Sequence, residues 1–170
     1  MKQLVITLIG TDRPGLVETL SDTVFKHHGN WQASSLSKLA GKFAGIIQID
    51  IKNDDAKALS IALDNISELD VLITDAPHQS EPDSTTHSLT VTGNDRPGII
   101  QEVTREIAKF GININNLEST AQSAANSGGV IFMADFDLDI ANTTSLDDLG
   151  EALEGLSDDL IVEFDVNDIH

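Results

Sequence analysis

The chain of 170 residues contains no cysteine, no tyrosine and a single tryptophan. The absence of cysteine excludes disulfides, thiolate nucleophiles and cysteine-ligated metal sites. The shortage of aromatic residues, six Phe and one Trp, argues against an RNA-binding sheet, because such sheets stack bases on aromatic rings beside basic side chains.

Basic residues are also scarce. Ten Lys and Arg stand against 28 Asp and Glu, the formal net charge is -18, and the last basic residue is Lys109. Thirteen Asp or Glu follow it. A field of this sign repels phosphate backbones and anionic lipid, so we expect no direct contact with nucleic acid or membrane. It suits either a basic surface on a protein partner or a need for solubility, and both interpretations stay open.

Long hydrophobic runs are missing as well. The apolar stretch at the N-terminus is interrupted at Gly10, which makes it too short for a signal peptide and typical of a strand. No apolar run approaches membrane-spanning length. We therefore expect a soluble, cytoplasmic protein.

One six-residue phrase occurs twice. Residues 10–15 read Gly-Thr-Asp-Arg-Pro-Gly, and residues 93–98 read Gly-Asn-Asp-Arg-Pro-Gly, 83 residues further on. The register continues beyond the phrase, with apolar residues at matching helical positions and Asn30 matching Asn113. This period suits a small domain rather than a solenoid repeat, so the sequence predicts two copies of one domain.

Both copies show the same pattern of elements. A strand precedes the phrase, a helix follows it, and a hairpin, a second helix and a last strand complete the unit. Pro14 and Pro97 fit the first turns of their helices. The order βαββαβ predicts an α+β fold of two ferredoxin-like domains, each an antiparallel sheet with its helices on one face. We expect domains at 1–76 and 87–170, a polar linker at 77–86, and sheets joined side by side at their edges.

The loop between the first strand and the first helix is the candidate binding site of each copy. A helix N-terminus presents unpaired N–H groups and partial positive charge, so a small carboxylate can dock there. Arg13 or Arg96 would add a charged fork, and Asn30 or Asn113 would offer an amide. Alternatively, Asp-Arg-Pro-Gly is only an efficient turn. Its repetition favours binding by at least one copy.

Other kinds of site find little support. The phrase has the glycine spacing of a phosphate loop but lacks the Lys and Ser or Thr that would follow. No set of nucleophile, base and orienting residue is apparent, so we expect no enzymatic activity, no cofactor and no metal. Asp135, Asp137 and Asp139 alternate along a strand, which fits a solvated face better than a weak cation site.

The phrase Asp-Arg-Pro-Gly, followed by Leu-Val or Ile-Ile and then by Gly and Asn at the next strand, resembles the ACT domain family. Both halves match. ACT domains are small regulatory modules that typically bind amino acids where the first loop and helix meet a neighbouring domain's strand edge. The resemblance implies ligand contacts at Asp12, Arg13, Pro14, Gly15, Asn30, Asp95, Arg96, Pro97, Gly98, Asn113 and Ile114.

One departure from the family pattern concerns the first copy. Gly29 directly precedes Asn30, and Trp31 stands where the second copy has Ile114. A bulky indole there would narrow the first site, so we expect the second copy to hold the better pocket.

Within the family, two ACT domains with these phrases are similar to a group of repressors of the glycine cleavage operon. The resemblance implies that glycine relieves repression and that the protein acts by antagonising a LysR-type activator through contact. An amino-acid-sensing regulatory subunit of a metabolic enzyme would have the same domains and remains an alternative. An acylphosphatase-like enzyme shares the topology, but its glycine-rich loop motif is absent. A homodimer is compatible, because regulatory sites of this kind often form across interfaces.

Overall fold

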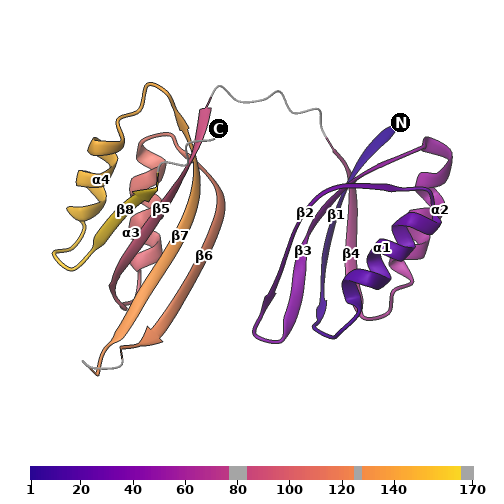
Figure 1. Cartoon of the computed structure of the whole chain (residues 1–170), viewed down its shortest axis with the longest axis horizontal. Helices are drawn as coiled ribbons and strands as arrows, with labels where there is room; N and C mark the ends of the chain where they lie inside the picture. The colour runs from indigo at the N-terminus through magenta and orange to yellow at the C-terminus, as the bar shows by residue number, and fades with distance from the viewer. Residues whose placement is uncertain (77–83, 125–127, 166–170) are drawn as a thin grey trace. The chain divides into compact units, whose positions relative to one another are not determined.

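The computed structural model describes residues 1–76, 84–124 and 128–165. The chain divides into two compact units, Met1–Ser80 (unit 1) and Glu81–His170 (unit 2). Each unit follows the order strand, helix, two strands, helix, strand, as Figure 1 shows. The predicted pair of ferredoxin-like βαββαβ domains is confirmed. The joining of the two sheets at their edges stays a prediction.

The same elements appear in both units at matching positions. Unit 1 contains β1 (Lys2–Thr11), α1 (Leu16–Lys26), β2 (Asn30–Leu39), β3 (Lys42–Ile51), α2 (Asn53–Asp64) and β4 (Leu69–Asp75). Unit 2 contains β5 (Ser84–Asn94), α3 (Ile99–Lys109), β6 (Asn113–Ser123), β7 (Val130–Ala141), α4 (Leu146–Glu154) and β8 (Ile161–Asp165). Helices α1 and α3 keep the offset of the repeated phrase.

The sheets have the strand orders β2-β3-β1-β4 and β6-β7-β5-β8, and all their neighbouring strands are antiparallel. Both helices of a unit cover one face of its sheet (Figure 1). The side chains of β1 alternate accordingly. Leu4, Ile6 and Leu8 are buried, whereas Thr7 and Ile9 are exposed.

Each unit has its own hydrophobic core. The first helix of each unit contributes a stripe of buried residues three or four positions apart, which places them on one side of the helix. On α1 the stripe is Leu16, Leu20 and Val24. On α3 it is Ile99, Val103 and Ile107. These are the positions at which the two halves of the sequence match beyond the repeated phrase.

The linker predicted at 77–86 extends too far. β5 begins at Ser84, and residues 84–86 pair with β7, while residues 77–83 lie outside the described residues. Thr86 donates a hydrogen bond to Asp139, and Thr85 donates one to Asn142. Threonine favours strands when cross-strand partners are present, and a polar composition alone does not reveal such partners.

Pro14 and Pro97 lie ahead of their helices rather than in the first helical turns. α1 begins at Leu16 with Gly15 as its N-cap, and α3 begins at Ile99 with Gly98 as its N-cap. Each glycine has left-handed backbone angles, so neither helix extends back to its proline.

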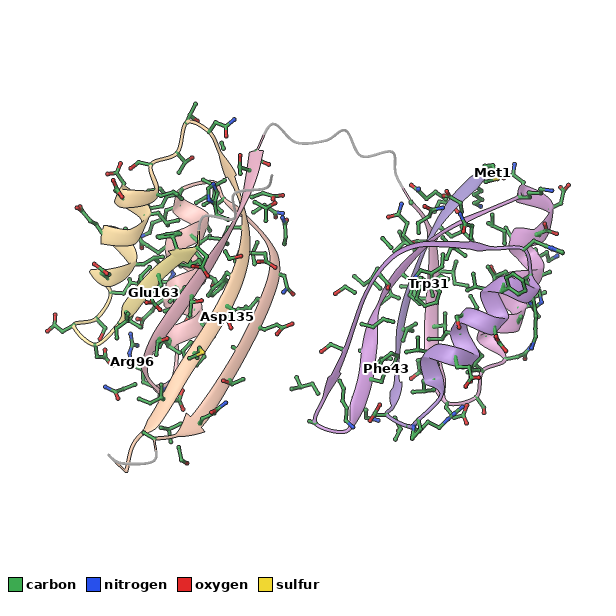
Figure 2. The ribbon with its side chains drawn as sticks, in the orientation of Figure 1. Met1, Trp31, Phe43, Arg96, Asp135 and Glu163 are labelled. Carbon is green, nitrogen blue, oxygen red and sulfur yellow. The ribbon has the colours of Figure 1, made fainter. Side chains whose placement is uncertain are left out.

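The sheet faces that point away from the helices differ between the units. In unit 1 this open face carries Ile46, Thr7 and Leu72 in one row across β3, β1 and β4, and Ile46 and Leu72 are largely exposed. In unit 2 a row across β7, β5 and β8 carries Asp135, Thr90 and Glu163 instead, and the two carboxylates are labelled in Figure 2. This row of the open face therefore carries apolar side chains in unit 1 and carboxylates in unit 2.

The alternating aspartates of β7 are held by hydroxyl groups of β5. Asp135, Asp137 and Asp139 accept hydrogen bonds at 2.7, 3.1 and 3.0 Å from Thr90, Ser88 and Thr86 respectively. Within the described part of the chain, no group of three or more His, Asp or Glu side chains could hold a metal ion. Cross-strand pairs of this kind stabilise an antiparallel sheet, so this row has a structural role.

Candidate functional site

Each candidate loop leads from the first strand of a unit into its first helix. The first glycine of the repeated phrase allows the segment that enters the last strand to pack closely against the first strand. A Cβ atom at Gly10 would lie 2.2 Å from the carbonyl oxygen of Glu68. At Gly93 it would lie 2.8 Å from Cδ2 of Leu160. Glu68 directly precedes β4, and Leu160 directly precedes β8. The missing side chain therefore lets the loop entering that strand lie against β1 or β5.

The last glycine of the phrase shapes the start of the helix. Gly15 and Gly98 have φ angles of 84° and 89°, and no described side chain caps α1 or α3. The Ile99 N–H makes a long bond of 3.4 Å to the Arg96 carbonyl. The uncapped helix ends therefore direct N–H groups and partial positive charge toward the loop, and the anion site expected there stays a prediction.

Both arginines of the phrase already form ion pairs. Arg13 donates to Glu68 and to the Pro14 carbonyl, each at 3.1 Å. Arg96 makes two bonds, at 2.9 and 2.5 Å, to Glu102 in the first turn of α3; Figure 2 labels Arg96. Hydrogen bonding between them raises the pKa of Arg96 and lowers the pKa of Glu102. A ligand carboxylate that takes both terminal nitrogens of Arg96 has to displace Glu102, whereas Glu68 accepts from only one nitrogen of Arg13.

The two aspartates of the phrase differ in their surroundings. The Asp12 N–H donates to the Gly41 carbonyl at 3.0 Å, and the Asp12 carboxylate forms an ion pair with Lys38. The Asp95 N–H donates to the Val130 carbonyl at 2.8 Å. None of the described basic residues forms an ion pair with the Asp95 carboxylate. The second loop therefore offers a carboxylate that a ligand ammonium group can approach without displacing a lysine.

Asn30 does not lie beside the loop of its own unit. It pairs with Asp50 of β3, which pairs with Gln3 near the start of β1. The loop begins after Thr11, at the other end of β1. The eight residue-to-residue steps of strand from Gln3 to Thr11 span about 26 Å. A single small amino acid cannot contact both the loop and the asparagine of one unit.

Asn113 has the same placement in unit 2. It pairs with Asp139, which pairs with Thr86, eight residues before the end of β5. Its amide donates to Oδ1 of Asn115 at 2.8 Å. Asn115 lies where the register of β6 shifts, so a β-bulge supplies the partner of this amide. The predicted site residues thus form two groups at opposite ends of each sheet.

Ile114 and Trp31 occupy equivalent positions beside the asparagines. Both are half-buried and pack against the cores of their units, Ile114 in unit 2 and Trp31 in unit 1. Trp31, labelled in Figure 2, is adjacent in sequence to Asn30 and so lies at the end of β1 away from Gly15. The indole therefore does not border the loop at Gly15, and the expectation that it narrows the first site stays a prediction for a ligand that contacts Asn30.

Three carboxylates at the loops were not predicted: Glu68, Glu102 and Asp159. Asp159 accepts hydrogen bonds from the Ser157 hydroxyl and, at 3.0 Å, from the Asn94 N–H. The bond from Ser157, supported by the one from Asn94, lowers the pKa of Asp159. A sequence signal exists for two of the three, because Glu68 and Asp159 each directly precede a buried leucine, Leu69 as the first residue of β4 and Leu160 just before β8.

Both repeated loops lie in segments that match models of a known domain family. Models described as the ACT domain match residues 2–74 and residues 83–159, and both repeated phrases lie inside the matched ranges. The chain belongs to the ACT-domain family. Its first ACT domain lies in unit 1 and its second in unit 2.

Two solved structures match this tandem ACT protein over nearly its whole length. A protein of unknown function from Galdieria sulphuraria has a TM-score of 0.85 and 26% identity, over 96% of this chain and 97% of that chain. A candidate glycine cleavage system transcriptional repressor has a TM-score of 0.72 and 22% identity, over 98% of each chain. At that identity the second likeness shows the fold alone.

Among curated proteins, a UPF0237 protein of Methanopyrus kandleri is 34% identical over 55 residues, or 32% of this chain. The match spans 61% of that relative's length. None of the helices in the described ranges is long and apolar enough to cross a membrane.

Proposed function

We propose that this ACT protein is an amino-acid-responsive regulator of transcription, with glycine as its effector, and not an enzyme. The observation that supports it most is the loop of the second ACT domain, which combines the uncapped N-terminus of α3 with the carboxylate of Asp95. A zwitterionic amino acid has a group for each: a carboxylate for the helix N–H groups and an ammonium for Asp95. Glycine offers these two groups without a side chain that needs its own pocket.

The ion pair between Arg96 and Glu102 beside this loop links ligand binding to the position of α3. Arg96 and Glu102 face each other across the start of α3 at 2.5 and 2.9 Å. A ligand carboxylate held by α3 competes with Glu102 for the guanidinium. A change of partner at Arg96 would shift the first turn of α3, and this differential contact is what an effector needs to bias a conformational equilibrium.

Asn30 and Asn113 are not part of the proposed site at the loop of their own domain. The loop and the asparagine of one domain lie at opposite ends of its sheet. We therefore assign Asn30 or Asn113 to a ligand only where another ACT domain brings its own loop to that asparagine, as the family resemblance implies.

The proposed partner is a LysR-type activator of the glycine cleavage operon, and the mechanism is repression by contact. Residues 81–170 hold three Lys or Arg against eighteen Asp or Glu, so the second domain repels DNA and attracts a basic protein surface. The fold shared with a candidate glycine cleavage system transcriptional repressor supports the choice of operon, whereas the LysR-type partner follows from the family resemblance. Glycine binding at the second loop then weakens the contact and relieves repression.

The ligand part of the proposal is tested by isothermal titration of the full chain with glycine, serine and alanine. We expect saturable glycine binding that Asp95→Ala weakens by about tenfold or more, because the charge-assisted bond to the ammonium is lost. Asp12→Ala is the matched control at the equivalent position of the first loop, where Lys38 already pairs with the carboxylate. This control should keep glycine binding near the wild-type level.

Other outcomes of the titration would place the binding site elsewhere or rule it out. Loss of binding in Asp12→Ala with retention in Asp95→Ala would move the sensor to the first domain. Loss in Asn113→Ala would show that the far asparagine contributes to the ligand, which then requires a second domain at that site. Absence of binding for all three amino acids would rule out the sensor and leave a protein-interaction module.

The partner part is tested with the purified LysR-type activator. We expect association that weakens about tenfold from low to physiological salt, because screening reduces the attraction between an acidic and a basic surface. Added glycine should weaken it further. Salt-independent association would contradict the electrostatic contact. Amino-acid binding without any association would favour the alternative, a regulatory subunit of a metabolic enzyme.

A further inference from the structure

The open face of the unit 2 sheet has an apolar end, which lies next to the repeated loop. Met133 and Ile161 lie on either side of Thr92 in one row across β7, β5 and β8, and they are 43% and 58% exposed. A hollow of about 230 Å³ beside Met133 is also lined by Ile131 and Thr120. Exposed apolar side chains around a hollow are typical of a surface that another molecule covers.

The rest of this open face is acidic. Its carboxylates are Glu118 on β6, Asp135, Asp137 and Asp139 on β7, and Glu163 and Asp165 on β8. The Lys and Arg residues of unit 2 lie in the loop or on α3 instead: Arg96, Arg105 and Lys109. Within the described residues, no ion pair involves a carboxylate of this face. The face therefore carries negative charge that no basic side chain compensates.

The placement of these carboxylates opposes the stability of the sheet. Glu118 lies directly opposite Asp135, and like charges at such positions are destabilising. Solubility is served at lower cost by charges on a helix surface, such as the exposed Glu151 and Glu154 of α4. Of the two interpretations of the acidic composition, this arrangement favours a partner of opposite charge over solubility alone.

We propose that the open face of unit 2 is the docking surface for a basic protein surface with an apolar anchor at one end. The anchor side chain enters the hollow beside Met133, and Lys or Arg side chains of the partner lie over the carboxylates. Complementary charge gives the contact its specificity, and a buried apolar anchor gives it most of its affinity. The identity of the partner, the LysR-type activator, rests on the proposed function.

The hollow is connected to the candidate binding loop of the same domain. The Asp95 N–H donates to the Val130 carbonyl at 2.8 Å, and Val130 directly precedes Ile131 in the lining of the hollow. Asn94, at the end of β5, lies opposite Ile131. An amino acid held at Asp95 therefore acts on the end of β7 that shapes the hollow. This contact gives the effector a route by which it weakens docking.

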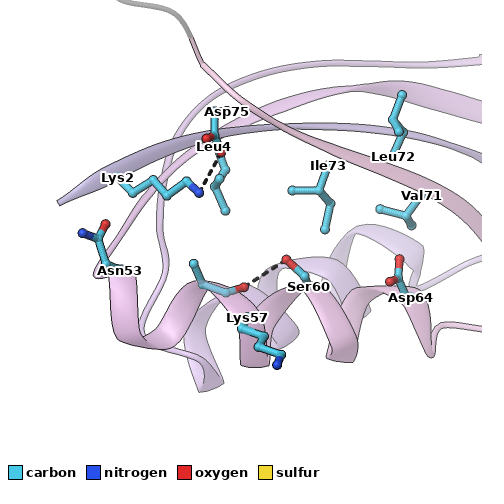
Figure 3. Close-up of a pocket in the computed structure, with 11 residues that line it drawn as sticks. Lys2, Leu4, Asn53, Lys57, Ser60, Asp64, Val71, Leu72, Ile73 and Asp75 are labelled. Atoms are coloured by element: carbon cyan, nitrogen blue, oxygen red, sulfur yellow. Dashed lines mark hydrogen bonds and ion pairs between the residues drawn. The ribbon is translucent and has the colours of Figure 1, made fainter.

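Two cavities of unit 1 lack this combination of an apolar hollow and acidic surroundings. One of about 560 Å³ lies between β4 and α2 (Figure 3). Lysines and aspartates both line it, and Lys2 and Asp75 form an ion pair of 2.8 Å there. The other, of about 470 Å³, lies around Ile46 and Leu72, and its lining includes one carboxylate, that of Asp70. Neither cavity selects a basic partner by its charge.

The test is isothermal titration of the full chain with the purified LysR-type activator. We expect the double variant Glu118→Gln/Glu163→Gln and the single variant Met133→Gln each to weaken association by about tenfold or more. Because Glu118 faces Asp135, the double variant should also unfold at a higher Tm than the wild type. Weaker association together with higher Tm is a result that a purely structural role of these carboxylates does not produce.

Two matched controls separate the docking surface from general effects. Glu151→Gln/Glu154→Gln removes the same charge from α4, and Ile46→Gln changes a 52% exposed residue on the open face of unit 1. Both controls should bind like the wild type. Equal weakening by the α4 variant would show that net charge alone drives association, which would overturn the docking surface. Association that the variants of the open face leave unchanged would overturn it as well.

A second probe separates failure of this surface from failure of the proposed partner. If the activator does not bind the wild type, the partner is wrong, and the surface is tested with a synthetic helical peptide that has lysines along one side and a leucine at one end. Peptide binding that Met133→Gln weakens and Ile46→Gln keeps would support the surface. No peptide binding, or binding that both variants keep, would overturn it. Glycine binding that leaves docking unchanged would overturn the route through Val130.

Discussion

Gly10→Ala is expected to destabilise the first ACT domain by about 3 kcal/mol or more, at the upper end of what overpacking costs. The new Cβ atom would lie 2.2 Å from the carbonyl oxygen of Glu68 and 2.7 Å from Cδ2 of Leu69. A carbonyl oxygen is part of the backbone, so β1 and the loop entering β4 would have to separate. That movement would also disturb the ion pair between Glu68 and Arg13, at 3.1 Å.

Thermal unfolding followed by tryptophan fluorescence measures this effect in the right domain. Trp31 is the single tryptophan and packs against the core of unit 1. Gly93→Ala is the matched control, because its Cβ would meet the tip of the Leu160 side chain at 2.8 Å, which can move more easily than backbone. We expect a large loss of Tm for Gly10→Ala in the Trp31 signal and a smaller one for Gly93→Ala in circular dichroism, because Trp31 packs only against the core of unit 1. Equal losses would show that contact with the Glu68 backbone is not what requires glycine.

Much of the fold could be predicted because the same domain pattern occurs twice in the sequence. The buried stripes of α1 and α3 fall at matching positions, as the matching apolar residues of the two halves predicted. The start of β5 was missed because Ser84 to Thr86 look like linker residues. Their strand structure depends on partners in β7, more than fifty residues away in the chain. Local composition does not contain that information.

The candidate site was predictable only in part, for a geometrical reason. The loops at Gly15 and Gly98 follow from local chemistry, since a helix start and a left-handed glycine are set by neighbouring residues. The asparagines were expected near the loops because they start the neighbouring strand. An eleven-residue helix separates each pair and carries the chain about 16 Å along the sheet. The ion pairs of Arg13 and Arg96 depend on side-chain reach, which residue spacing does not fix.

Phe136→Ala should be the most damaging of the core substitutions in the second domain. Phe136 is 1% exposed and has the largest side chain among the fully buried residues that the structure describes. It lies on β7 opposite Leu89 of β5 and Leu117 of β6, with its ring in the core of unit 2. Removing the ring leaves a cavity and costs about 3–5 kcal/mol. Domains are typically stable by only about 5–15 kcal/mol, so the second domain should approach its stability limit.

Circular dichroism and Trp31 fluorescence together show whether the loss of stability in Phe136→Ala is confined to the second domain. The buried residues form separate clusters in unit 1 and unit 2, so circular dichroism should report early unfolding of part of the chain while Trp31 fluorescence keeps its wild-type transition. Phe136→Leu keeps most of the apolar volume and should cost less than about 1.5 kcal/mol. A parallel drop in the Trp31 transition would show that the two domains unfold as one cooperative unit. In that case a change at the loop of one domain would alter the stability of the other, which is the coupling that an effector-controlled contact requires.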